Sequence, residues 1–226
     1  MQLAEVQKQG FAILPEVLTG GDLDHLEESL KRFQLPRSRA AMRHALRHPA
    51  VLAVARDLRL LAIAQEVLGC DPIPFKATLF EKSPISNWLV AWHQDKALPL
   101  RERSEHRAWG PWSVKDGVIY ANAPASALSG VVALRLHLDD STPENGPLRV
   151  LPGTHTMGIL GDETIHDLSA RTTGIDCLVP RGGILVMRPL IVHASSKSRG
   201  KVRRRALHIE YAASASFADG LELAIT

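Results

Sequence analysis

The sequence predicts a mainly β protein, an antiparallel β-sandwich or barrel preceded by helices. From Pro72 onward, short β-rich runs alternate with Gly, Pro and Asn, which is typical of strands joined by turns. Before Pro72, apolar residues recur at helical spacing. No flexible linker separates the two parts, and 226 residues suit one domain with a sizeable core. We therefore expect a single domain over 1–226, with a helical part at about 16–70 and a β-core at about 72–213.

The helical part contains two candidate regions. Thr19 and Asp22 are suited to cap the first helix. Its apolar face is formed by Leu23, Leu26, Leu30 and Phe33. The second region covers about 39–68, and Gly69 is well placed to end it. Both apolar faces are available to cover one sheet.

The expected strands lie at 10–14, 75–82, 88–95, 117–120, 131–139, 147–151, 175–179, 183–188 and 203–213, with no helices between those after Pro72. Two of them have clear faces, because successive side chains of a strand point to opposite sides. In 131–139, one face carries Val132, Leu134, Leu136 and Leu138, and the other carries Ala133, Arg135 and His137. In 203–211, Leu207, Ile209 and Tyr211 share a face with Arg203 and Arg205, opposite Arg204, Ala206, His208 and Glu210. Polar residues opposite a packed apolar face either contact solvent or line a polar cavity.

Charge and cysteine content exclude several classes of protein. The net charge is only +3, so the composition indicates neither nucleic acid nor a membrane as a partner. Six of the nine residues in the tract 197–205 are basic, which indicates a solvated turn before a strand or, alternatively, recognition of an anionic substrate. Cys70 and Cys177 lie far apart, which suggests neither a disulfide framework nor a cysteine zinc site.

The sequence contains no obvious targeting signal. The N-terminal residues have no basic region followed by an apolar core, and no apolar run approaches membrane-spanning length. We therefore expect a soluble cytoplasmic protein with no membrane partner. The oligomeric state is not indicated.

The segment "AWHQD" raises the question of a metal site. His93 and Asp95 are two residues apart, so on a strand they point to the same side. A third ligand from elsewhere would complete the two-histidine, one-carboxylate triad that holds Fe(II) and leaves positions open. His137 and Asp139 have the same spacing, and their plainer interpretation is a cavity histidine followed by carboxylates at a strand end. The spacing alone does not decide between the pairs.

Later residues favour the first pair. A triad oxygenase that uses 2-oxoglutarate needs a distal histidine and a cation for the far carboxylate, and arginine binds a carboxylate bidentately. His193 follows the expected strand at 183–188, and Arg204 comes eleven residues later on the polar face of the next strand. Ser195 and Ser196 lie near His193, but no G-x-S-x-G elbow supports a nucleophile.

Longer motifs then identify a resemblance. The stretches "GFAILPEVLTGGDLDHLEESL", "WHQD", "ENGPLRVLPGTH" and "VHASSKSRGKVRRRALHIEYA" run through nearly the whole chain. Together they resemble the phytanoyl-CoA dioxygenase family of non-haem iron oxygenases, which includes ectoine hydroxylases. In that family the first two ligands precede the "NGPLRVLPGTH" hallmark by some tens of residues, which fits His93 and Asp95 rather than His137 and Asp139.

The resemblance implies a double-stranded β-helix, the cupin-like jelly roll, with the N-terminal helices packed on one sheet. It implies Fe(II) held by His93, Asp95 and His193, with 2-oxoglutarate and O₂ as co-substrates and Arg204 at the far carboxylate of 2-oxoglutarate. Lys76 and Arg135 match positions that line the pocket in relatives. Lys76 is a candidate for a substrate carboxylate or for a second 2-oxoglutarate oxygen, and its plainer role is a surface lysine. A carboxylate at Asp95, where related halogenases have a small residue, favours hydroxylation.

Four further residues are candidates for the substrate pocket. Trp112 and Lys115 lie in 109–117, expected to be a loop that either packs on the barrel or forms a substrate lid. His208 and His137 share strand faces with Arg204 and Arg135, and we expect them to support the site rather than bind metal.

The leading interpretation is an Fe(II)- and 2-oxoglutarate-dependent dioxygenase that hydroxylates a small or medium-sized polar metabolite and releases succinate and CO₂. A zinc metallohydrolase on the same ligands is one alternative, and it leaves Arg204 without a purpose. A non-catalytic ligand-binding jelly roll is another, and the complete triad argues against it. A nucleic-acid demethylase has less support, because no alternation of aromatic and basic residues suggests a base-stacking groove.

Overall fold

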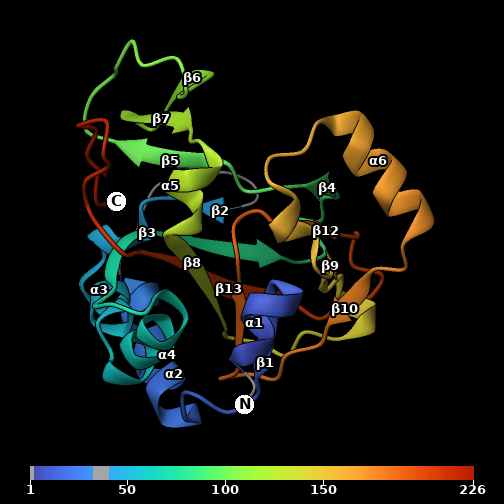
Figure 1. The fold of residues 1–226 in the computed structure, drawn as a ribbon. Coiled ribbons are helices and arrows are strands. Elements are labelled where there is room, and N and C mark those ends of the chain that lie inside the picture. The colour runs from blue at the N-terminus through green and yellow to red at the C-terminus, as the bar shows by residue number, and fades with distance from the viewer. Residues whose placement is uncertain (1–2, 33–40) are drawn as a thin grey trace.

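The computed structural model describes residues 3–32 and 41–226. Its strands are β1 (Phe11–Leu14), β2 (Ala41–Met42), β3 (Ile73–Lys82), β4 (Val90–His93), β5 (Ala97–Leu100), β6 (Trp112–Lys115), β7 (Val118–Asn122), β8 (Val131–His137), β9 (Leu148–Leu151), β10 (Ile175–Cys177), β11 (Ile184–Met187), β12 (Val192–Ser195) and β13 (Arg204–Ala212). Its helices are α1 (Ala4–Gln9), α2 (Gly20–Arg32), α3 (Pro49–Ala55), α4 (Leu58–Leu68), α5 (Ala125–Ser129) and α6 (Asp162–Arg171), with 3-10 turns η1 (Ala45–Arg47), η2 (Pro143–Asn145) and η3 (Thr154–Met157). Figure 1 shows their arrangement.

Two antiparallel sheets form the core of the fold. The larger has the strand order β1-β11-β8-β13-β3-β2, and the smaller has the order β10-β9-β12-β4. A buried cluster joins their facing sides, with Ala133 and Leu185 from the larger sheet and Val150 and Ile191 from the smaller sheet or beside it. A third sheet, β5-β7-β6, extends this core (Figure 1). The expected mainly β jelly-roll architecture is confirmed.

The helices α2, α3 and α4 cover the outer face of the larger sheet, as the sequence predicted (Figure 1). Their buried side chains include Leu23, Leu26, Val51, Leu60 and Val67, packed against Leu134, Leu136, Leu207 and Ile209. Each fully buried side chain of this size contributes about 1.5–3 kcal/mol relative to exposure. Tyr211 fixes the helical layer further, since its hydroxyl donates a hydrogen bond to the Ala55 carbonyl at 2.9 Å. Phe33 of the expected apolar face lies outside the described residues.

The alternation of β8 and β13 therefore has the predicted consequence. Their apolar faces lie under the helices, so Arg135, Arg204 and His208 point between the two sheets, where they line a cavity. All three are buried. The polar face belongs to a cavity and not to the solvent-exposed surface.

The predicted helix ends are also present. Thr19 and Asp22 bond reciprocally at the start of α2: each accepts a hydrogen bond from the other's backbone N–H, at 2.8 and 3.3 Å. Gly69 ends α4 in the left-handed conformation, with φ of 75°. The expected second helical region is divided, however. Pro49 begins α3, and the Asp57 side chain accepts the Arg59 N–H to begin α4.

Two expectations about the β-core were wrong. Two helices, α5 and α6, lie between its strands, and α6 follows the usual helical signals, with Asp162 and Glu163 in its first turn. The expected loop 109–117 contains strand β6, which pairs with β7 through a turn at Asp116 and Gly117, both with positive φ. Asp-Gly is a strong hairpin signal that the sequence interpretation passed over. His193 follows β11 in the chain, as expected, and it lies within a further strand, β12, that was not among the expected strands.

Of the helices in the described part of the chain, none combines the length and apolar character needed to cross a lipid bilayer.

Candidate metal centre

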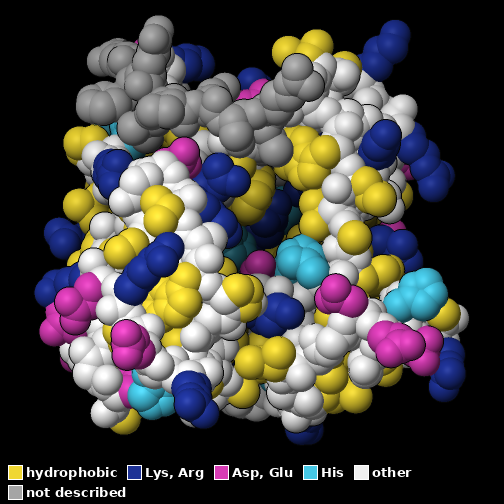
Figure 2. All heavy atoms as spheres, turned by 90° about the horizontal axis from the view of Figure 1, so that it is seen from above, with side chains coloured by type: hydrophobic (Ala, Val, Ile, Leu, Met, Phe, Trp, Pro, Cys, Tyr) yellow, Lys and Arg dark blue, Asp and Glu magenta, His cyan; other side chains and the backbone are white. Residues whose placement is uncertain are grey.

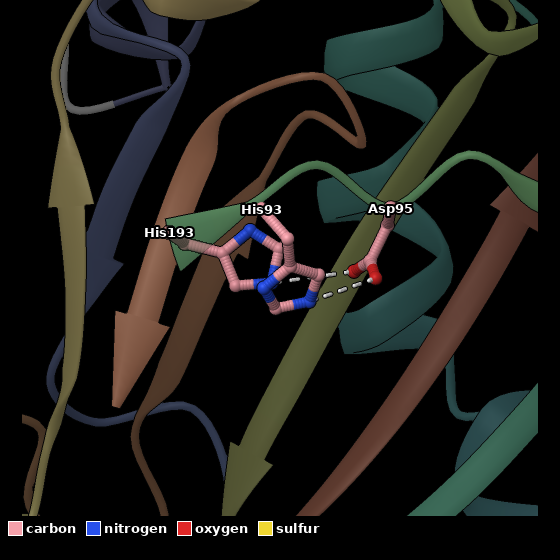
Figure 3. Close-up of side chains that lie close together, drawn as sticks. All are labelled: His93, Asp95 and His193. Carbon is pink, nitrogen blue, oxygen red and sulfur yellow. Dashed lines mark ion pairs between the residues drawn. The ribbon is translucent and has the colours of Figure 1, made fainter. Parts of the chain in front are cut away.

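Strands β4 and β12 bring together His93, Asp95 and His193. The two histidines are direct register partners across this antiparallel pair. The Nε2 atoms of His93 and His193 lie 3.7 and 3.6 Å from the two carboxylate oxygens of Asp95 (Figure 3). One ligand atom from each residue lies within 4.8 Å of the other two. Two imidazole nitrogens and a carboxylate oxygen at this separation fit a single divalent transition-metal ion.

The second nitrogen of each imidazole sets which atom is available. His93 Nδ1 lies 2.8 Å from the Ala91 carbonyl, and His193 Nδ1 lies 2.9 Å from the Ile191 carbonyl. A carbonyl only accepts hydrogen bonds, so both Nδ1 atoms carry the proton. The lone pairs are therefore on the Nε2 atoms, which face Asp95 as metal ligands would.

Burial and charge favour the protonation states that a metal requires. Burial lowers the pKa of His193 to about 4, so its imidazole is neutral at physiological pH. Burial alone would raise the pKa of the Asp95 carboxyl, but the attraction of three histidines and Lys76 holds that pKa well below its usual range. At His193 and Asp95 the site therefore presents a neutral imidazole and a carboxylate.

The other H-x-D pair forms no such cluster among the described residues. The Asp139 carboxylate accepts two hydrogen bonds at 2.8 Å from the Arg205 guanidinium, on the outer face of the sheet. His137 is fully buried. In the described part of the chain, His93, Asp95 and His193 form the one group of this kind.

The ligands open into a cavity of about 130 Å³ between the sheets. Figure 2 shows a hollow at the centre of one face of the molecule, with basic side chains at its walls. The residues that line the cavity are Lys76, Thr78, Phe80, Lys82, Trp88, Val90, His93, Asp95, Arg135, Leu148, Met187, His193, Ser195, Arg204 and His208. The cavity thus joins the candidate metal ligands to Arg204, Arg135 and Lys76.

Arg204 is a buried cation held by main-chain carbonyls. Its Nη2 donates to the Gly146 carbonyl at 2.8 Å and lies 3.5 Å from Ser195 Oγ, while its Nε donates to the Asn145 carbonyl at 3.3 Å. No carboxylate of the described residues lies within ion-pair distance of this guanidinium. Its location in the cavity suits an anionic ligand.

The "NGPLRVLPGTH" motif explains how Arg204 is positioned. Asn145 and Gly146 supply the two carbonyls that orient it. Gly146 has φ of 67°, and a Cβ there would lie 2.4 Å from the Ser196 carbonyl oxygen, so only glycine fits. The motif brings these carbonyls against the end of β12.

Two more cations lie near Arg204. Arg135 stacks on Phe80, 4.9 Å from the ring centroid, and its Nε has no hydrogen-bond partner. Lys82 donates to Ser195 Oγ at 2.6 Å and to the Ser196 carbonyl. Burial, with Arg204 and Arg135 nearby, lowers the pKa of Lys82 to about 7. This end of the cavity carries an excess of positive charge.

Sequence reasoning did not identify three residues here. Lys82 and Ser195 lie on the cavity wall, and Gln94 lies buried between the candidate metal ligands His93 and Asp95. Alternation from Lys76 along β3 would have placed Lys82 on the inner face. Alternation from His193 would have done the same for Ser195, for which only a nucleophilic role had been considered.

The remaining candidates are distributed as follows. His208 lines the cavity next to Asp95, and burial lowers its pKa to about 3. His137 is fully buried and is not one of the residues that line the cavity. Neither of its ring nitrogens has a hydrogen-bond partner. Trp112 packs in a separate apolar cluster beside the β5-β7-β6 sheet. Lys115 lies on the exposed end of β6, with its ammonium over the Tyr120 ring.

Comparison with known proteins gives a consistent result. Residues 6–206 match the model of the family described as phytanoyl-CoA dioxygenase (PhyH). The chain is 30% identical to the L-proline trans-4-hydroxylase of Streptomyces griseoviridis, over 90% of this chain and 82% of that protein. It is 25% identical to the ectoine dioxygenase of Halomonas elongata, over 76% of this chain and 51% of that protein.

Solved structures agree with the fold. EctD from S. alaskensis with bound Fe superposes with a TM-score of 0.71 at 18% identity, over 94% of this chain and 75% of that one. AviO1 from Streptomyces viridochromogenes superposes with a TM-score of 0.68 at 22% identity, over 93% of both chains. These similarities support the same arrangement of facing sheets.

Proposed function

The chain belongs to the phytanoyl-CoA dioxygenase family of iron- and 2-oxoglutarate-dependent oxygenases, and from this premise we propose that it hydroxylates a small polar metabolite, with release of succinate and CO₂. The observation that carries the proposal is the convergence of two Nε2 atoms and a carboxylate on one point at the wall of a cationic cavity.

His93, Asp95 and His193 are the proposed Fe(II) ligands. Their donor set suits Fe(II), and their Nδ1–H groups are already committed to backbone carbonyls, so the rings do not reorient on binding. Bound Fe(II), together with 2-oxoglutarate and O₂, supplies the oxidising power for C–H hydroxylation. The chain itself orients the reactants and excludes water around them.

Arg204 is the proposed partner of the far carboxylate of 2-oxoglutarate. Its guanidinium already faces the cavity, and Ser195 Oγ, 3.5 Å away, supplies a second polar contact. Arg135, with its unpaired Nε, supplies a further hydrogen bond to the same co-substrate. A buried guanidinium for a dicarboxylate has no role in zinc hydrolysis, so this feature also argues against the metallohydrolase alternative.

Two observations support hydroxylation in particular. Asp95 occupies the third ligand position with a carboxylate, leaving no position among the protein ligands for a halide. The relatives at 30% and 25% identity are a proline hydroxylase and an ectoine dioxygenase, whose names describe small polar substrates.

Anaerobic titration of metal-free protein with Fe(II) and 2-oxoglutarate tests this function. We expect a weak visible charge-transfer band from chelated 2-oxoglutarate. His93→Ala abolishes the band and Arg204→Gln shifts its appearance to higher 2-oxoglutarate concentration, while the neighbouring exposed Arg203→Gln serves as the control. Folded protein that binds Zn(II) but gives no band with Fe(II) and 2-oxoglutarate would contradict the proposal. Slow succinate formation in air separates an oxygenase from a non-catalytic binding domain.

A further inference from the structure

The cavity has a second charged end, on the same pair of strands as Arg204. Along β13 and β3 the inward-facing register partners are Arg204 with Lys82, His208 with Thr78, and Glu210 with Lys76. Arg204 and Glu210 are six positions apart, which corresponds to about 20 Å along a strand. Asp95 interacts electrostatically with both His208 and Lys76. The candidate metal ligands therefore lie between the two charged ends.

Lys76 and Lys115 both lie beside the Tyr120 ring near this second end. Lys76 lines the cavity, and its Nζ forms an ion pair with Glu210 at 2.5 Å. The Nζ atoms of Lys76 and Lys115 lie 5.9 and 5.0 Å from the centroid of the Tyr120 ring, within the range of cation–π interactions. Both ammonium groups therefore lie beside the same ring, and the charge of Lys76 acts on Lys115. Desolvation, followed by the repulsion of Lys76, lowers the pKa of Lys115.

The charges at this end do not balance. Glu210 neutralises Lys76, and the nearby Asp116 is paired with Arg43 at 3.5 Å. Lys115 has no carboxylate within ion-pair distance among the described residues. The positive charge of Lys115, which lies beside Lys76 on the Tyr120 ring, therefore remains without a partner carboxylate at this end. A singly charged carboxylate matches it, whereas a phosphate dianion brings more negative charge than this end compensates.

We propose, on the basis of the function above, that the substrate is a small carboxylic acid whose carboxylate binds between the ammonium groups of Lys76 and Lys115. It enters on the side of the metal ligands opposite Arg204, so substrate and 2-oxoglutarate occupy separate ends of the cavity. An amino acid and a simple carboxylic acid share this group. In an amino acid, the ammonium group is placed near Glu210 or Asp95.

The variants are chosen so that folding is preserved. Lys76→Gln alone leaves Glu210 as an unpaired buried charge, so we combine it with Glu210→Gln, which replaces the pair with neutral side chains. Lys115 is exposed, so Lys115→Gln and Lys115→Glu leave the core unchanged. Lys201→Gln, in the exposed basic tract, is the matched control.

The experiment measures coupled turnover on a panel of compounds. L-Proline and other small amino acids are compared with their N-acetyl derivatives, which keep only the carboxylate, and with their methyl esters, which lose it. We expect hydroxylated product by mass spectrometry from acids and not from esters. If the N-acetyl derivatives also react, the carboxylate is sufficient for recognition. If only the free amino acids react, the site also binds the ammonium group.

For the best acid, we expect Lys115→Gln to raise the KM about three- to tenfold and Lys115→Glu to raise it further. The variant that combines Lys76→Gln with Glu210→Gln is expected to raise this KM at least about tenfold. The KM for 2-oxoglutarate changes less than the KM for the acid, and the Lys201→Gln control leaves both values unchanged. Esters that react as well as acids, or lysine variants with unchanged KM, would overturn the inference while the charge-transfer band stays intact. Absence of that band in wild-type protein would overturn the proposed function and this inference with it.

Discussion

His93 and His193 lie opposite each other across the β4–β12 ladder, with their ring centroids 4.3 Å apart. Both rings are fixed by an Nδ1 hydrogen bond to the carbonyl two residues earlier in the same chain segment. The site is therefore preorganised: strand pairing sets the separation of the rings, and local hydrogen bonds set their tautomer. Asp95 completes the group and lies two residues after the last residue of β4. Its backbone N–H donates a hydrogen bond to the Pro189 carbonyl.

The first prediction concerns the charge of the ligand set. Asp95→Asn keeps the shape of the side chain but removes the anionic ligand. Loss of a residue that only hydrogen-bonds to a metal ligand typically lowers metal affinity roughly 10- to 100-fold, and we expect Asp95→Asn to lower the affinity for Fe(II) or Co(II) by more than this. Anaerobic metal titration followed by competition with a chelator measures this. Metal affinity equal to that of wild-type protein would place the metal elsewhere.

The second prediction concerns Arg204. Arg204→Lys keeps a positive charge but loses the planar, bidentate guanidinium. We expect the KM for 2-oxoglutarate to rise about 10- to 100-fold, which corresponds to one or two charge-assisted hydrogen bonds. The KM for the hydroxylated substrate changes little. Arg203→Lys, on the opposite face of the chain, is the control, and equal effects of the two variants would contradict the assignment.

The sequence predicted much of this architecture because strand alternation and helix periodicity are local. The two faces of 131–139 and 203–211 followed from spacing alone, and they placed Arg135, Arg204 and His208 on the inner face. The helices that cover the outer face were recognised from their apolar spacing and from the capping residues around Thr19 and Gly69.

What the sequence did not predict depends on contacts between distant segments. Lys82 is a surface-type residue by composition, and it becomes a cavity residue only because β3 pairs with β13 and the end of β12 lies over it. The role of Gln94 is likewise set by loops at 158–160 and 190. Helix α6 was missed although its signals are local, because a β-core was expected without interruption.

The third prediction is a pH dependence from Lys82. Its pKa is lowered to about 7, chiefly by burial, so its ammonium is charged below that pH and neutral above it. A charged Lys82 next to Arg204 attracts the co-substrate, so the affinity for 2-oxoglutarate falls as pH rises through 7. Calorimetry in buffers of different ionisation enthalpy is expected to detect proton uptake on binding above pH 7. Lys82→Gln abolishes this uptake, whereas uptake that persists in the variant assigns it to another group.

The fourth prediction concerns acid stability. Burial alone would raise the pKa of Asp139, but its bidentate hydrogen bonds with Arg205 outweigh burial and lower that pKa. The stabilisation is therefore present above the pKa of an unfolded aspartate, about 3.9, and is lost as pH falls through the lower folded value. Asp139→Asn reduces the free energy of unfolding by about 1–3 kcal/mol at neutral pH and by less in acid.

Urea unfolding at several pH values measures this difference. Asp176→Asn is the matched control, because its partner Arg149 and its own carboxylate are both well exposed, and such pairs contribute about 0–1 kcal/mol. A constant difference between Asp139→Asn and wild type at every pH would show that the carboxylate charge is not the source.

The last prediction concerns the buried amide of Gln94, between the proposed metal ligands His93 and Asp95. Gln94 Nε2 donates to the carbonyls of Gly158 and Leu190 at 2.9 and 2.8 Å, and its Oε1 accepts the Leu160 N–H at 2.8 Å. The side chain thus points away from the cavity and ties the two flanking segments to the chain between His93 and Asp95. Gln94→Glu has the same shape but no N–H group, so two buried carbonyls lose their donors and face an anion.

We expect Gln94→Glu to lower the free energy of unfolding by about 3 kcal/mol or more at neutral pH. A protonated glutamate regains one donor, so the deficit shrinks as pH falls toward the ordinary glutamate pKa of about 4.3 and grows above it. The exposed Gln9→Glu is the control, with a change within about 0.5 kcal/mol. Metal affinity is measured on the same samples, because loss of the Gln94 hydrogen bonds allows the backbone between His93 and Asp95 to move. Unchanged stability in Gln94→Glu would show that these three hydrogen bonds do not hold the metal-binding segment in place.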